Sequence, residues 1–117
     1  MADMGIAVGG ATASPGVVRL PGVSTIRLTV RSVAGMRRGR ARYTVDTTDG
    51  NSINGGAEVV GAIFTVGPGG LVLNENLRFG ANAQAGIILV NIFVSELDGT
   101  GNPIGQEDGT SVTLGAL

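Results

Sequence analysis

Apolar and polar residues alternate along most of this chain. In residues 24–33, Ile26, Leu28 and Val30 are separated by arginine and threonine, and residues 40–47 repeat the pattern. Successive side chains of a β-strand point to opposite faces, so this period of two predicts a half-buried strand in each segment. No segment keeps the i, i+3, i+4 spacing of an amphipathic helix over three turns, and we therefore expect little helix.

Two later segments are apolar on both faces. Residues 58–66 and residues 86–97 carry aliphatic side chains at odd and at even positions, and the second is the most hydrophobic strand-like stretch of the chain. A sheet in a sandwich buries only one of its faces. The pattern therefore indicates a central layer or a surface covered by another subunit. We interpret residues 58–66 as an inner strand and expect oligomer contacts on the second apolar face.

Glycine-rich segments separate these strands. Residues 48–56, 67–70 and 98–103 contain Asp-Gly, Asn-Gly or Gly-Pro pairs, which are typical of tight turns. Further strands are predicted over residues 71–79 and 110–114. Together these elements predict an all-β fold, a β-sandwich of about eight short strands in jelly-roll order. A small barrel and an immunoglobulin-like strand order are the alternatives.

Residues 1–23 are predicted to form an extended N-terminal arm, and residues 24–117 the sandwich domain. The arm consists mainly of small residues and Pro-Gly pairs, with Val17, Val18 and Leu20 among its few larger apolar side chains. Such a segment buries too little surface to offset its ordering entropy, about 1–2 kcal/mol per residue for the backbone. We expect it to bind a partner subunit through these three residues, by adding a strand to an exposed sheet edge.

Composition narrows the chemistry that is open to the chain. It has no histidine, lysine, cysteine or tryptophan, while 21 of its 117 residues are glycine. The usual bases, nucleophiles and transition-metal ligands are therefore missing. Glu58, Glu75 and Glu96 lie on predicted strands and leave a glycosidase-like carboxylate pair open, but sugar sites usually carry aromatic platforms, and the chain has one tyrosine. We expect no enzymatic activity, no cofactor and no metal site.

Four of the eight arginines lie within six residues: Arg37, Arg38, Arg40 and Arg42. Arg31 is nearby on the preceding predicted strand, so the cluster is expected at the turn between two strands. Arginine pairs well with carboxylate and phosphate, and an acidic protein partner is one interpretation. A solvated turn that protects a sheet edge is another. Nucleic acid is disfavoured, because the net charge is −1 and stacking platforms are few.

The acidic residues give weaker signals. Glu96, Asp98, Glu107 and Asp108 invite comparison with a calcium loop, but proline stands where the EF-hand loop needs glycine, so solvated turn residues are favoured. Glu75 interrupts an apolar face and, if buried, needs a partner, for which we expect an arginine.

The first residues contain an acid where a signal peptide carries a basic residue, and no sustained apolar stretch follows. No run approaches about 18 consecutive apolar residues, the length expected of a membrane-spanning helix. We therefore expect synthesis in the cytoplasm and no membrane partner.

In its small size, abundant Gly and Ala, lack of catalytic residue types, Pro-Gly arm and strands apolar on both sides, the whole chain resembles the capsid decoration, or cement, proteins of tailed bacteriophages. The resemblance implies a dimer or trimer on the virion surface that binds the major capsid protein and clamps neighbouring coat subunits. A phage tail, fibre or other shell subunit and a small ligand-binding β-sandwich are alternatives.

Overall fold

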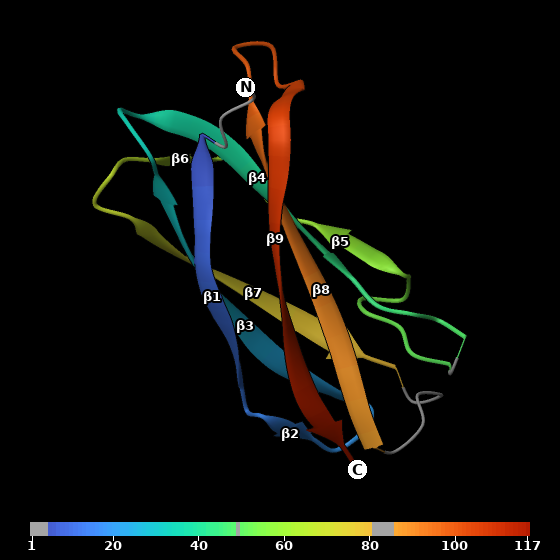
Figure 1. Cartoon of the computed structure of the whole chain (residues 1–117). Helices are drawn as coiled ribbons and strands as arrows, with labels where there is room; N and C mark the ends of the chain where they lie inside the picture. The colour runs from blue at the N-terminus through green and yellow to red at the C-terminus, as the bar shows by residue number, and fades with distance from the viewer. Residues whose placement is uncertain (1–4, 49, 81–85) are drawn as a thin grey trace.

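The computed structural model describes residues 5–48, 50–80 and 86–117, and these form two β-sheets packed face to face (Figure 1). The smaller sheet has the order β1-β3-β7, with β1 (Ile6–Ser14), β3 (Gly22–Ser32) and β7 (Leu71–Phe79). The larger has the order β2-β9-β8-β4-β5, and β6 also pairs with β4. Its strands are β2 (Val17–Val18), β4 (Arg37–Thr44), β5 (Glu58–Val60), β6 (Phe64–Val66), β8 (Gly86–Leu97) and β9 (Pro103–Ala116). The all-β sandwich is confirmed, whereas the pairings do not show a jelly roll.

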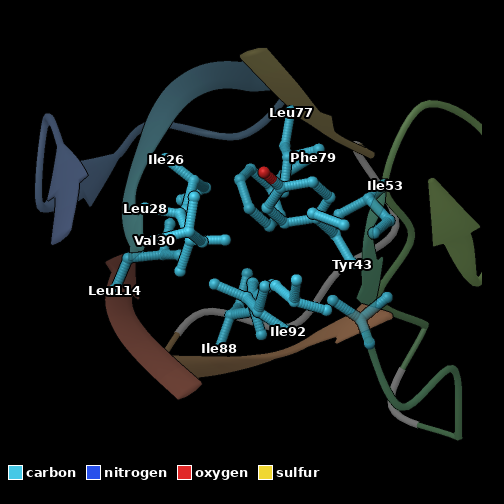
Figure 2. Packing of buried hydrophobic residues seen from close by; sticks show 14 of the residues in the cluster. Ile26, Leu28, Val30, Tyr43, Ile53, Leu77, Phe79, Ile88, Ile92 and Leu114 are labelled. Atoms are coloured by element: carbon cyan, nitrogen blue, oxygen red, sulfur yellow. The ribbon is translucent and has the colours of Figure 1, made fainter. Parts of the chain in front are cut away.

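The core lies between the two sheets and is mainly aliphatic (Figure 2). Ile26 and Leu28 of β3 face Ile88 and Ile92 of β8, and all four side chains are fully buried. Each buried side chain of this kind contributes about 1.5–3 kcal/mol relative to an exposed one. The alternating positions of β3 and β8 therefore fix which face of each sheet points inward.

The segment predicted as an N-terminal arm belongs to the sandwich over its described residues, 5–23. β1 pairs antiparallel with β3 from Ile6 to Ser14, and β2 pairs parallel with β9. Ile6 and Val18 are each only 3% exposed. The composition of β1 concealed this role because its small side chains bury little area. Its backbone nevertheless pairs with β3 on both sides of an irregularity at Gly9 and extends the smaller sheet to three strands.

The loop over residues 48–56 contains a tight turn, as its Asn-Gly pair predicted. Asn54 and Gly55 have φ angles of 50° and 85°, and the flanking Ile53 and Gly56 exchange backbone hydrogen bonds of 2.8 and 3.0 Å. Two consecutive positive φ angles define the hairpin turn that Asn-Gly favours. This turn places the Ile53 side chain, which is fully buried, at the end of the core beside Tyr43 (Figure 2).

Residues 58–66 are not the inner strand that their apolar pattern predicted. They form two short strands, β5 and β6, which both pair with β4 at the edge of the larger sheet. Residues 61–63 interrupt them, and Val60 and Ile63 remain about half exposed. An apolar run of this length fits a buried strand or an interrupted edge, and Gly61 favours the interruption.

Candidate functional site

Four exposed aliphatic side chains gather at one end of the outer face of the six-stranded sheet. Ile87 of β8 is 80% exposed and Leu89 is 47% exposed, while Val17 and Leu117 are 55% and 64% exposed. We call these four residues the apolar patch. Gly115 of β9 pairs with Ile87 on one side and with Val17 on the other, and Leu89 and Leu117 are two residues along the chain from Ile87 and Gly115.

The apolar patch fulfils the prediction that residues 86–97 are apolar on both faces. Ile88, Val90 and Ile92 point into the core, whereas Ile87 and Leu89 point outward. Nothing within the described part of the chain covers the outward pair. Large apolar patches on soluble proteins mark interaction surfaces, since water contact with aliphatic side chains is unfavourable. Sequence reasoning did not single out Leu117, because no local pattern signals it.

The arginine cluster lies on β4 and not at a turn. β4 begins at Arg37, and the turn is formed by residues 33–36. Arg42 lies outward between two carboxylates, 3.1 Å from Glu107 Oε1 and 3.3 Å from Glu58 Oε2. Its guanidinium also stacks on the Phe93 ring, 4.7 Å from the centroid. The hydrogen bond with Glu107 contributes most to raising the pKa of Arg42. The positive charge of Arg42 is therefore paired with carboxylates of the same chain.

The other three arginines differ in how they are held. Arg37 forms a 2.9 Å ion pair with Glu96, whose side chain is largely buried, and Arg38 donates a long hydrogen bond to the Gly99 carbonyl. Arg40 makes no ion pair with any described residue, and it shares the outer face with Arg38 and Arg42. The structure thus brings three of the four predicted arginines to one face. Two of the four are neutralised by carboxylates of the same chain.

The three arm residues predicted to bind a partner have separate positions. Val17 lies in the apolar patch, as a binding residue would. Val18 points into the protein's own core, and Leu20 packs against that core. The alternation along β2 explains the difference, because neighbouring side chains of a strand face opposite sides.

A pocket of about 410 Å³ opens at the edge of the sandwich, between β7 and residues 60–64. Tyr43 lies at its base, and the inward-facing Glu75 of β7 lines its wall. Burial raises the pKa of Glu75, and burial followed by the charge of Glu75 raises the pKa of Tyr43 to about 12. The arginine partner expected for Glu75 is not found among the described residues.

The carboxylates of the segment compared with a calcium loop each have their own partner. Glu96 pairs with Arg37, Glu107 with Arg42, and Asp108 accepts a 2.9 Å hydrogen bond from the Val8 amide. Asp98 accepts hydrogen bonds from Thr100 and Asn102, and the bond from the Thr100 hydroxyl is the main cause of its lowered pKa. In the described ranges, no three acidic side chains gather closely enough to hold a metal ion.

Among the described residues, no helix is long and apolar enough to cross a membrane.

Comparison with known proteins adds little. No protein-family model matches the chain, and no curated protein matches it. Among solved structures, the fold is similar to one described as the crystal structure of BslA, a bacterial hydrophobin. The match has 16% sequence identity and a TM-score of 0.47, and it covers 97% of this chain and 96% of the other. A match of this strength supports no conclusion about function.

Proposed function

We propose that this chain is a non-enzymatic structural protein that self-associates and binds to a larger protein assembly. The apolar patch carries the proposal. Val17, Ile87 and Leu89 project outward from strands whose opposite faces are already buried in the core, and Leu117 directly follows β9. A second copy would cover them and remove aliphatic surface from water, at about 25 cal/mol per Å².

The small residues beside the apolar patch support a second copy as the occupant. Beside Ile87 and Leu89, the outward positions of β9 are Gly109, Ser111, Thr113 and Gly115. All four residues have short side chains or none, and two such faces could stack at the ~10 Å spacing of packed sheets. Since the same face would serve both partners, the expected assembly is a symmetric dimer.

The particular assembly that we propose is the outside of a phage capsid. There the chain would clamp neighbouring copies of the major capsid protein, as the resemblance to decoration proteins implies. A phage tail or fibre subunit is the alternative within the structural class. The pocket beside Glu75 favours a second candidate, a small ligand-binding module. Its lining combines the aromatic ring of Tyr43 with the Glu75 carboxylate, which has no ion-pair partner among the described residues.

We infer that the finer fold is an immunoglobulin-type sandwich, in preference to the predicted jelly roll. The order β1-β3-β7 facing β9-β8-β4 corresponds to the A-B-E and G-F-C strands of that type, and the parallel pairing of β2 with β9 corresponds to a split first strand. A sandwich of this type has two outer sheet faces, one on the three-stranded and one on the six-stranded sheet.

Size-exclusion chromatography with light scattering tests self-association over a range of concentrations. The unaltered protein should form a dimer or larger object, and the variant Ile87→Ser/Leu89→Ser should shift toward monomer by at least tenfold in dissociation constant, because each buried aliphatic contributes about 1.5–3 kcal/mol. The matched control is Val23→Ser/Val72→Ser, which alters two half-exposed aliphatics on the other sheet.

The control variant should associate like the unaltered protein, and the thermal unfolding of both variants should stay nearly unchanged. A monomer at all concentrations would remove the support for a shell component and favour the ligand-binding module. Equal effects of the two variants would show that association does not depend on the apolar patch.

A further inference from the structure

The outer face of the three-stranded sheet carries three exposed arginines, Arg27 and Arg31 of β3 and Arg78 of β7. We call this surface the arginine face. In the described parts of β1, β3 and β7 no other outward side chain is charged, since Glu75 shares the inward side with Ile26, its partner in the ladder. No ion pair joins any of the three arginines to a described carboxylate.

The strand register spaces these charges evenly. Arg27 and Arg31 are four residues apart on β3, about 13 Å at ~3.3 Å per residue. Arg78 pairs with Val23, which lies four residues from Arg27 in the opposite direction. The Cα positions of the three arginines therefore span about 26 Å along the sheet. A protein of net charge −1 thus presents one face on which the charged side chains of the described residues are all arginine.

Polar side chains and a surface hollow lie beside these arginines. Threonine and asparagine side chains separate the arginines on β3 and β7, with Thr25 donating to Asn76 at 2.6 Å. Beside Arg27, a surface hollow of about 430 Å³ is bounded by Gly9 and Gly10 at an irregularity in the β1–β3 register. Because these two glycines carry no side chain, a partner group could approach the guanidinium there.

We propose that the arginine face binds the acidic surface of a protein partner. Arginine forms paired hydrogen bonds with carboxylates, which suits a row of guanidinium groups beside hydroxyl and amide side chains. Bases stack on aromatic platforms, but the chain's aromatics, Tyr43, Phe64, Phe79 and Phe93, are buried in the core or lie on the other sheet. An acidic protein is therefore favoured over nucleic acid.

This inference deepens the proposed function and rests on it for the identity of the partner. The apolar patch and the arginine face belong to different sheets. One face would hold a second copy, while the other would hold the acidic partner. The binding of acidic groups itself can be tested whether or not the chain self-associates.

The experiment measures binding of the full chain to poly-L-glutamate by calorimetry, with double-stranded DNA in a parallel titration. The test variant is Arg27→Gln/Arg31→Gln/Arg78→Gln, and the matched control is Arg38→Gln/Arg40→Gln/Arg42→Gln, which removes the same charge from the other sheet. The test variant should lose on the order of tenfold in affinity for poly-L-glutamate, because three exposed ion pairs are removed. The control should lose much less, and added salt should weaken binding.

Three results would overturn the proposal: no binding of poly-L-glutamate, equal losses in both variants, or a larger loss in the control, which would return the binding role to the β4 arginines. Tight, salt-sensitive binding of DNA that only the test variant loses, without binding of poly-L-glutamate, would assign the face to nucleic acid. Light scattering on the same samples separates these outcomes from a failure of self-association.

Discussion

The two outer faces of the sandwich use arginine in opposite ways. On the six-stranded sheet, Arg42 lies between Glu58 of the neighbouring β5 and Glu107 of β9, which is two strands away across β8. On the three-stranded sheet, Arg27 and Arg31 have threonine, glycine, asparagine and alanine as outward neighbours. The same alternation of arginine and apolar residues therefore produces a face on which carboxylates offset part of the charge in one sheet, and a face with arginine alone among its described charged side chains in the other. Cross-strand neighbours decide which charges remain free.

The two faces differ in their apolar residues as well. Ile87 and Leu89 lie on the same strand of the larger sheet, beside Val17 and Leu117. The exposed aliphatics of the smaller sheet are two separate valines among polar side chains. Scattered apolar residues are ordinary on a protein surface, whereas a contiguous group indicates a contact. The faces therefore suit different partners.

The largest expected effect concerns the strand that completes the arginine face. Deleting residues 1–16 removes β1, uncovers the backbone edge of β3 and takes Ile6 out of the core. We expect a loss of about 3–5 kcal/mol or complete unfolding, measured by urea denaturation, because Ile6→Ala alone should cost about 2–4 kcal/mol.

Ile87→Ala is the matched control for this prediction, since it makes the same change at an 80% exposed position and should cost less than about 0.5 kcal/mol. Unchanged stability after the deletion would mean that residues 1–16 are a separate arm after all. In that case the arginine face would consist of two strands.

Much of the fold could be predicted from the alternation of residues. The segments 71–79 and 86–97 form strands with the predicted bounds, and the glycine-rich segments separate strands as expected. β1 was missed because its small side chains give no apolar alternation, although its backbone pairs with β3 along most of its length. The predicted strand over residues 110–114 lies within the longer strand β9. The first half of β9 is polar and resembles a loop in sequence, although it pairs with β8.

The charge distribution on the two outer faces was harder to predict from the sequence. A dense run such as Arg37 to Arg42 attracts attention, yet the carboxylates that pair with two of its arginines come from distant segments. Arg27 and Arg78 are 51 positions apart in sequence, and they share a face only because β3 pairs with β7. Free charge is therefore a property of the strand pairing, which no local pattern contains.

The next largest expected effect is the coupling energy within the two ion pairs of β4, which distinguishes paired from free arginines. In the Arg37–Glu96 ion pair the side chains are 32% and 13% exposed, whereas Arg42 and Glu107 are 37% and 38% exposed. Double-mutant cycles with Gln at each position should give a coupling of about 1–2 kcal/mol for the first pair and about 0.2–1 kcal/mol for the second.

Added salt should reduce the coupling of Arg42 with Glu107 more than that of Arg37 with Glu96, because exposed charges are screened more strongly. Couplings near zero for both pairs would mean that the β4 arginines are as free as those of the arginine face. The charge contrast between the two faces would then disappear.

The smallest expected effect concerns Glu75, the charged residue of the smaller sheet that points inward. Burial raises its pKa above the ordinary value of 4.5, so the folded state holds the proton more tightly than the unfolded chain. The contribution of Glu75 to stability is fully present below pH 4.5 and is lost as the pH rises through the pKa of the folded state. The Glu75→Gln variant should therefore be slightly more stable than the unaltered protein at pH 7, and thermal unfolding should show the stabilities of the two proteins converging at about pH 4.

Asp98→Asn is the control of opposite sign, because hydrogen bonds from Thr100 and Asn102 lower the pKa of Asp98 below 3.8. Its stabilising contribution is present at neutral pH and is lost as the pH falls. A Glu75→Gln variant that is less stable at pH 7 would mean that an attractive partner holds the carboxylate, and Glu75 would then belong to the charge network and not to an open pocket.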